Sequence, residues 1–151
     1  MGSDRINLRP ATAGDQKSIV AIIREAHLNP MDLKWSNFVV AVDEASGDVV
    51  GTGQVKAHRD GSRELASIAT VPAYQRRGIA RRIVERLLAE HPDTLYLTCQ
   101  STLGPFYEQF GFRAIGEEEW APYFRRLKKL AGVFELLSRG DVTLLVMKRD
   151  G

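Results

Sequence analysis

Hydrophobic and polar residues follow two periodicities along this chain, and together these predict its strands and helices. Alternating or continuous apolar runs indicate seven strands, at residues 6–9, 38–42, 49–57, 64–71, 94–99, 112–116 and 142–148. Apolar residues at helical spacing indicate helices that begin near Thr12, Ile79 and Pro105. Turn-forming residues at 44–48 and 59–62 separate the second, third and fourth strands, which are therefore expected to form an antiparallel meander.

Local signals add detail to this outline. Thr12 and Asp15 have the spacing of a helix N-cap and the third helical residue. Gly51 and Gly53 lie inside a strand, which predicts either close backbone contact or a β-bulge. The helix from Ile79 connects strands 64–71 and 94–99, and such a crossover predicts that these two strands are parallel in an otherwise antiparallel sheet.

A fourth helical pattern occupies residues 117–140, between the last two strands. Its apolar positions are Phe124, Leu127, Leu130, Ala131, Phe134 and Leu137, and Arg125, Arg126, Lys128 and Lys129 take the other side. This helix could cover a binding site, form a homodimer contact or touch an anionic surface. A packed helix with an ordinary solvated polar face accounts for the pattern equally well.

Composition limits the class of protein. With 151 residues, of which 44% are hydrophobic and 26% charged, we expect one soluble globular domain spanning residues 1–151. A net charge of +2 does not call for a nucleic-acid partner, and no apolar run is long enough to cross a membrane. The single cysteine, Cys99, forms no internal disulfide, and we expect a cytoplasmic protein. No His/Cys cluster has metal-ligand spacing, so no metal is expected.

The chemically most informative stretch is Gln75-Arg76-Arg77-Gly78-Ile79-Ala80, which lies between a predicted strand and a predicted helix. The first amides of a helix have no intrahelical acceptor, and the helix dipole favours negative charge there. Gly78 permits close backbone approach, and Arg76, Arg77 and Arg81 add positive charge. The stretch therefore predicts a pyrophosphate site, although neither common nucleotide-binding glycine motif occurs in the chain.

This stretch resembles the [RQ]-x-x-G-x-[GA] signature of the GCN5-related N-acetyltransferases, with Gln75, Gly78 and Ala80 at its fixed positions. A second block, residues 106–112, reads F-Y-E-Q-F-G-F and resembles the family's F-Y-E-K-x-G-F block. The resemblance implies an α/β (α+β) fold with a mixed, mostly antiparallel sheet of six to seven strands flanked by helices. Most relatives join the last two strands by a tight hairpin, so the helix inserted at 117–140 departs from the pattern.

The resemblance also implies the reaction and its cosubstrate. Acetyl-CoA would be gripped through its pyrophosphate, and the acetyl group would pass to a primary amine of a small molecule or protein by direct attack in a ternary complex. Residues 27–37, which hold Pro30, Met31 and Trp35, often border the acceptor pocket in the family; a surface connection pinned by Trp35 is the alternative. The cofactor-binding residues implied are Ile68, Ala69, Thr70, Gln75, Arg76, Arg77, Gly78, Ile79, Ala80, Arg81 and Ser101.

Two side chains match positions to which the family assigns catalysis. Glu64 is the first candidate for the general base that takes a proton from the amine, with His58, Glu117, Glu118 and Glu119 as further candidates. A Glu directly after a hairpin turn is usually exposed, which is the alternative for Glu64. Tyr107 aligns with the tyrosine that donates to the departing thiolate; a packed aromatic residue is its alternative.

The match leaves a few positions open. Backbone amides around Ile68–Thr70 would polarise the acetyl carbonyl and hold the pantetheine arm. Many relatives place an Asn after the fifth strand, where this chain has Gln100-Ser101-Thr102, so Gln100 or Ser101 would replace that contact. Cys99 is better explained as a small buried residue than as a nucleophile. A non-catalytic acyl-CoA sensor or interaction module is the main alternative function, and a nucleic-acid binder using residues 125–129 is a weaker one.

Overall fold

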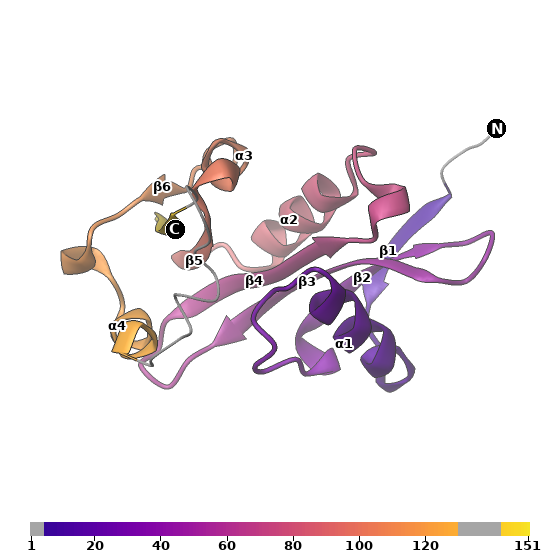
Figure 1. Ribbon diagram of the computed structural model, residues 1–151, viewed down its shortest axis with the longest axis horizontal. Helices are drawn as coiled ribbons and strands as arrows, with labels where there is room; N and C mark the ends of the chain where they lie inside the picture. The colour runs from indigo at the N-terminus through magenta and orange to yellow at the C-terminus, as the bar shows by residue number, and fades with distance from the viewer. Residues whose placement is uncertain (1–4, 130–142) are drawn as a thin grey trace. The chain divides into compact units, whose positions relative to one another are not determined.

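The computed structural model describes residues 5–129 and 143–151 of the chain (Figure 1). Among these residues, seven strands pair in the order β1-β2-β3-β4-β5-β7-β6. The strands are β1 (Ile6–Pro10), β2 (Phe38–Asp43), β3 (Val49–Ala57), β4 (Arg63–Thr70), β5 (Leu95–Gln100), β6 (Arg113–Ala114) and β7 (Leu144–Arg149). The α-helices are α1 (Gln16–Glu25), α2 (Ile79–Glu90), α3 (Gly104–Glu108) and α4 (Pro122–Lys129). The mixed, mostly antiparallel sheet expected from the sequence is confirmed.

Contacts within the chain divide it into two compact units. The first consists of Met1–Lys56 and Leu65–His91, and the second of Ala57–Glu64 and Pro92–Gly151. Each unit is therefore built from two separate stretches of sequence, and strand β4 passes from the second unit to the first after Glu64. A single domain over residues 1–151 remains a prediction.

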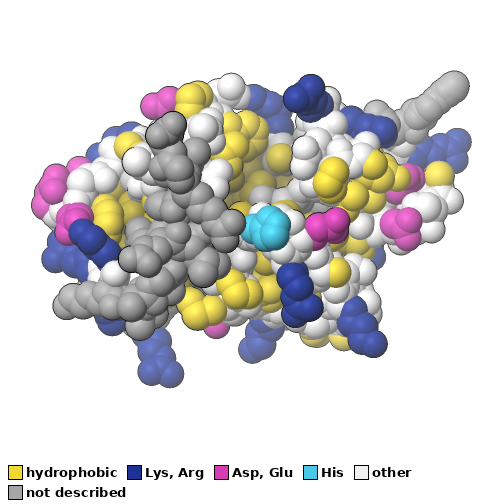
Figure 2. Space-filling model, in the orientation of Figure 1, with side chains coloured by type: hydrophobic (Ala, Val, Ile, Leu, Met, Phe, Trp, Pro, Cys, Tyr) yellow, Lys and Arg dark blue, Asp and Glu magenta, His cyan; other side chains and the backbone are white. Residues whose placement is uncertain are grey.

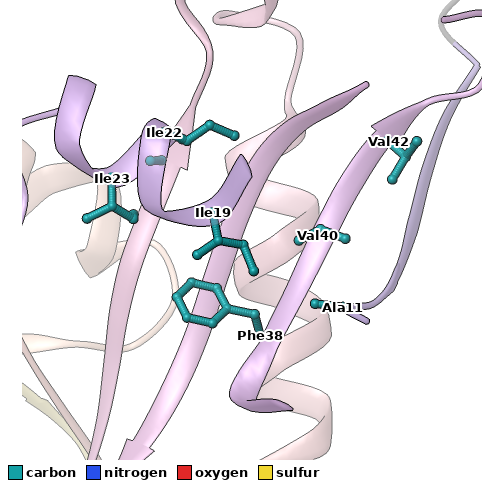
Figure 3. Close-up of a cluster of buried hydrophobic side chains, with 8 residues drawn as sticks. Ala11, Ile19, Ile22, Ile23, Phe38, Val40 and Val42 are labelled. Carbon is teal, nitrogen blue, oxygen red and sulfur yellow. The ribbon is translucent and has the colours of Figure 1, made fainter. Parts of the chain in front are cut away.

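In the first unit, helices α1 and α2 lie on opposite faces of the sheet (Figure 1). Ile19 and Ile23 of α1 pack with Phe38 and Val40 of β2, and Figure 3 shows Ile19 pointing toward the Phe38 ring. Burying an apolar side chain of this size stabilises the fold by about 1.5–3 kcal/mol. The apolar stripe read from residues 19–26 is thus the face that fixes α1 to the sheet.

On the other face, two glycines let α2 approach strand β3. A Cβ atom on Gly53 would lie 2.5 Å from Ile83 Cγ2, and one on Gly51 would lie 2.9 Å from Ile79 Cγ2. The register of β2 against β3 also shifts between Ala41 and Val42, opposite this stretch. Both readings of the strand glycines, close contact and a local irregularity, therefore apply.

In the second unit, β5 pairs in parallel with the start of β4, with Glu64 opposite Tyr96, so the predicted parallel pair is confirmed. Strand β7 pairs antiparallel with β5 and β6. The strand expected at 112–116 is shorter, because the Phe112 N–H bonds back to Tyr107 O at 3.3 Å and ends the preceding helix instead. Within the inserted segment, α4 is the described helix; positions from 130 to 142 lie outside the described residues.

The first helix begins as the sequence predicts. The Thr12 N–H donates to Asp15 Oδ2 at 2.7 Å, and the Asp15 N–H donates to Thr12 O at 2.9 Å. Arg9 donates to both Asp15 carboxylate oxygens, at 2.7 and 3.2 Å. The hydrogen bond from Arg9, followed by those from Thr12, holds the pKa of Asp15 below its usual value despite burial.

Replacing this carboxylate should destabilise the fold in a pH-dependent way. Asp15→Asn is expected to lower the free energy of unfolding at pH 7 by about 1 kcal/mol, the usual cost of losing a helix cap. Because the folded-state pKa is depressed, the stabilisation is complete above the unfolded pKa of about 3.9 and is lost as pH falls through the folded value. Urea unfolding of both proteins across this range should show the gap closing in acid; a gap independent of pH would contradict this account.

Candidate active site

The predicted phosphate-binding stretch forms a turn that leads directly into α2. Gly78 is the N-cap residue and has φ 78°, a left-handed conformation, with no atom within 4 Å of an added Cβ. The first intrahelical hydrogen bond runs from the Arg82 N–H to Gly78 O at 3.1 Å. The amides of the preceding first turn therefore lack intrahelical acceptors, which is the arrangement that binds phosphate groups.

Side-chain contacts fix the residues that precede Gly78 in this turn. Gln75 Nε2 donates to Thr70 O at 3.1 Å, which ties the turn to the end of β4. The Arg77 guanidinium lies 4.9 Å from the centre of the Tyr74 ring, and the Tyr74 hydroxyl donates to Asp43 Oδ2 at 2.5 Å. Arg76, Arg77 and Arg81 are all exposed. On the face of the molecule in Figure 2, Lys and Arg side chains of the described residues are scattered among polar and apolar ones.

Strand β4 carries Ile68, Ala69 and Thr70, whose amides were predicted to face the thioester. The residue before them, Ser67, has φ 60°, which is unusual for a non-glycine residue inside a strand. Thr52 Oγ1 donates to Ser67 O at 2.8 Å, and Gln54 Nε2 donates to Ser67 Oγ at 2.9 Å. A left-handed residue within a strand is typical of a bulge, which locally disrupts the regular ladder.

In the second unit, Glu64 is buried and paired with His58. The residue is 4% exposed, so the alternative interpretation, an exposed Glu after the hairpin, is wrong. His58 Nε2 lies 2.9 Å from Glu64 Oε1, and both side chains are at most 7% exposed. A buried carboxylate requires a partner of this kind, because an unpaired charge in the interior is costly.

Helix α4 contributes the ring that covers His58. The Tyr123 and His58 rings stack with centroids 3.5 Å apart and planes 14° apart, and Phe124 meets His58 edge-on at 6.3 Å. The Tyr123 N–H donates to Asp60 Oδ2 at 2.8 Å, which fixes the start of α4 to the hairpin between β3 and β4. Helix α4 thus contacts His58, the partner of Glu64, directly.

Tyr107 lies on α3 and is also buried. Burial, together with the nearby Cys99, raises the pKa of its phenol above the ordinary value. The aromatic rings of Phe106 and Phe112 meet Tyr107 edge-on at 5.0 and 6.1 Å. Cys99 is buried, and desolvation raises the pKa of its thiol to about 11, which opposes formation of a nucleophilic thiolate.

The remaining predicted residues occupy the ends of strands and the surface. Ser101 follows β5; its N–H donates to Thr143 O at 2.7 Å, and its Oγ accepts from the Thr143 N–H at 3.3 Å. The Ser101 hydroxyl proton therefore stays available for a ligand. Glu117 pairs with Lys128, and Glu119 with Arg113 at 2.8 Å, all at exposed positions where a general base would gain little from burial.

The structure brings the predicted residues together in two groups. Ile68–Thr70 and residues 75–81 lie in the first unit, whereas Glu64, Tyr107 and Ser101 lie in the second. Sequence reasoning missed Tyr123 as a partner of His58. It also missed the buried polar residues of β3, whose signal is the alternation Thr52-x-Gln54-x-Lys56.

Residues 5–129 and 143–151 contain no group of three or more His, Cys, Asp or Glu side chains arranged to hold a metal ion. No described helix combines the length and apolar character needed to cross a membrane.

Comparison with known families decides the class of protein. The family model for the acetyltransferase (GNAT) domain matches residues 34–114, which is more than half of the chain. The chain belongs to the GNAT acetyltransferase family. The match includes the Gly78 turn, the His58–Glu64 pair and Tyr107. No curated protein sequence matches the chain.

Solved GNAT structures share the fold at low sequence identity. N-acetylglutamate synthase from Neisseria gonorrhoeae, complexed with coenzyme A and N-acetyl-glutamate, superposes with a TM-score of 0.75 at 18% identity over 98% of this chain and 35% of its own. Rv2747 from Mycobacterium tuberculosis, in complex with CoA and NLQ, gives 0.74 at 18% over 96% and 99%. A GNAT-family acetyltransferase from Staphylococcus aureus gives 0.67 at 15% over 95% and 98%. The chain therefore spans only about a third of the gonococcal synthase.

The Gly78 turn can be tested against a matched glycine. Gly47 has φ 79°, and an added Cβ would likewise meet no atom within 4 Å, so Gly47→Ala imposes the same backbone strain in a turn remote in sequence. Gly78→Ala is expected to weaken CoA binding by about ten- to a hundredfold, the value of one or two hydrogen bonds to a charged group. Titration calorimetry measures this difference. Equal affinities for both variants would remove the turn from the cofactor site.

Proposed function

We propose that this GNAT protein is an acetyl-CoA-dependent N-acetyltransferase that transfers the acetyl group to a primary amine by direct attack in a ternary complex. The observation that carries the proposal is the Gly78 turn at the start of α2, in a chain that matches the acetyltransferase family over this region. CoA-bound neighbours with the same fold support it. A cytoplasmic location is part of the same proposal.

The cosubstrate would be held through charge and backbone contacts. The amides at residues 76–80 and the helix dipole would bind the pyrophosphate, and the guanidinium groups of Arg76, Arg77 and Arg81 would neutralise its charge. The amides after Ser67, in Ile68–Thr70, would bind the pantetheine arm and the acetyl carbonyl oxygen. Amides fixed in advance in this way typically lower a barrier by about 3 kcal/mol. The Ser101 hydroxyl is the proposed second contact to pantetheine.

Glu64 is the proposed general base. An amine attacks only as its neutral form, whereas a lysine-type ammonium in water has a pKa of about 10.4. The proton would pass to Glu64, directly or through a water, while the hydrogen bond between His58 Nε2 and Glu64 Oε1 holds the carboxylate in place. The amine nitrogen then forms a bond to the acetyl carbon, the C–S bond breaks, and the thiolate of CoA leaves.

Tyr107 is proposed to stabilise that thiolate. Its raised pKa means that the buried phenol holds its proton more tightly than a thiol of pKa about 8.5 does. A hydrogen bond from Tyr107 to the sulfur therefore fits better than complete proton transfer, and solvent would supply the final proton once the product departs.

Thiol release from acetyl-CoA tests the proposed reaction. Incubation with a panel of amines and peptides should release free CoA thiol with at least one acceptor. Glu64→Gln should then lower kcat by about a hundred- to ten-thousandfold, the usual contribution of a general base. A non-catalytic acyl-CoA module predicts the opposite: CoA binds, no acceptor is turned over, and neither Glu64→Gln nor Tyr107→Phe has an effect.

The contact of Tyr123 with His58 gives a second kinetic test. Tyr123→Leu removes the stacked ring, whereas Tyr123→Phe keeps it. A stacked aromatic pair is worth about 0.5–1.5 kcal/mol, so kcat should fall by about two- to tenfold more in Tyr123→Leu than in Tyr123→Phe. Steady-state kinetics would measure kcat, and ¹H–¹⁵N spectra would report the change in the environment of the His58 imidazole. An unchanged kcat despite an altered imidazole signal would separate α4 from catalysis.

A further inference from the structure

A layer of buried polar side chains lies on one face of strand β3. Thr52 and Gln54 are fully buried, and Lys56 is 3% exposed. Alternate residues of a strand point to opposite faces, so these three lie opposite Gly51 and Gly53, which face α2. Apolar side chains would be the stable choice at three buried positions of a central strand.

Gln54 has an acceptor atom that the fold does not use. Its Nε2 donates to Asp32 O at 3.2 Å and to Ser67 Oγ at 2.9 Å. The carbonyl of Asp32 can only accept, so the amide nitrogen must be the atom on that side. Gln54 Oε1 is then buried, and no described residue donates to it. Such an atom in a native core calls for a ligand or water as its partner.

The buried side chain of Lys56 has no carboxylate partner among the described residues. Its Nζ donates to Met31 O at 3.1 Å, and among the described residues no carboxylate lies within ion-pair distance of it. A carbonyl oxygen satisfies one of the three ammonium protons and carries no compensating charge. Buried lysines are ordinarily paired, so this site favours an anionic group.

Two residues with strained backbone lie at the same place. Asp32 has φ 57° and Ser67 has φ 60°, and Gln54 bonds to both of these residues. Non-glycine residues in this conformation persist only where their surroundings hold them, and they cluster at ligand sites. Ser67 also directly precedes Ile68, the first of the amides proposed to hold the thioester.

We propose that Lys56 and Gln54 form the acceptor subsite and that the acceptor is a small amine bearing a carboxylate, such as a free amino acid. The Lys56 ammonium binds the carboxylate, and Gln54 Oε1 accepts a hydrogen bond from the amine nitrogen. This inference rests on the proposed acetyl transfer and names its substrate class. It places the nucleophile beside Ser67, next to the strand segment that presents the acetyl group.

Matched acceptors test the charge requirement. Each free amino acid is compared with its primary amide, which keeps the amine and loses the carboxylate. For the wild-type protein, kcat/KM should favour the acid by about tenfold or more. Lys56→Met should bring the ratio toward one, mainly through KM, and Lys56→Arg should retain part of it. The exposed Lys17 provides the control, since Lys17→Met should leave the ratio unchanged.

Further measurements on Lys56→Met and on the wild-type protein separate the outcomes. Thermal unfolding of Lys56→Met should show no loss of stability, because an apolar residue replaces an unpaired buried charge; CoA affinity should also be retained. If amides were turned over as fast as acids, or if the acid-to-amide ratio of kcat/KM were unchanged in Lys56→Met, the subsite would be refuted. The proposed acetyl transfer would not be affected by either result. If no amine is turned over, calorimetry of amino acids and amides against the CoA-bound protein decides the subsite by itself, and equal affinities would refute it.

Discussion

The left-handed conformation of Ser67 is the constraint on which the proposed cosubstrate site in the first unit depends. A strand that continued regularly through this residue would commit the following amides to the sheet ladder. A strained residue of this kind costs about 1–3 kcal/mol, and hydrogen bonds from Thr52 and Gln54 hold it in place. Side chains of β3 therefore fix the conformation of Ser67 in β4. Through Ser67 they also set the direction in which the following residues, Ile68–Thr70, continue.

Buried polar groups recur in both units and set them apart from an ordinary apolar core. In the second unit, the Glu64 carboxylate is paired with His58 beneath the Tyr123 ring. In the first, Gln54 and Lys56 lie near Met31 and Asp32 in place of apolar packing. Each arrangement places polar groups where apolar side chains would be more stable, and the apolar cluster between α1 and β2 supplies compensating stability.

The strands and helices could be predicted because their apolar periodicity is local. The Gly78 turn could also be located, since its glycine, its arginines and its position between strand and helix are all visible in the sequence. The burial of Glu64 could not be predicted. It depends on His58, which lies across a hairpin, and on Tyr123, which lies 59 positions after Glu64 in the sequence (123 − 64). The polar layer on β3 reads as an exposed strand face, and a left-handed serine has no sequence signal comparable to that of glycine.

The alternation of side chains along β3 separates two tasks within one strand. Gly51 and Gly53 accommodate the helix that begins at the phosphate turn, and Gln54 and Lys56 belong to the opposite side. Under the proposed acceptor subsite, selectivity for the amine would change with substitutions at Gln54 and Lys56, while Gly51 and Gly53 would keep α2 and its proposed phosphate-binding turn in place. Substitutions within residues 51–56 would then allow related proteins to accept new amines without changes to the residues that bind the acyl donor.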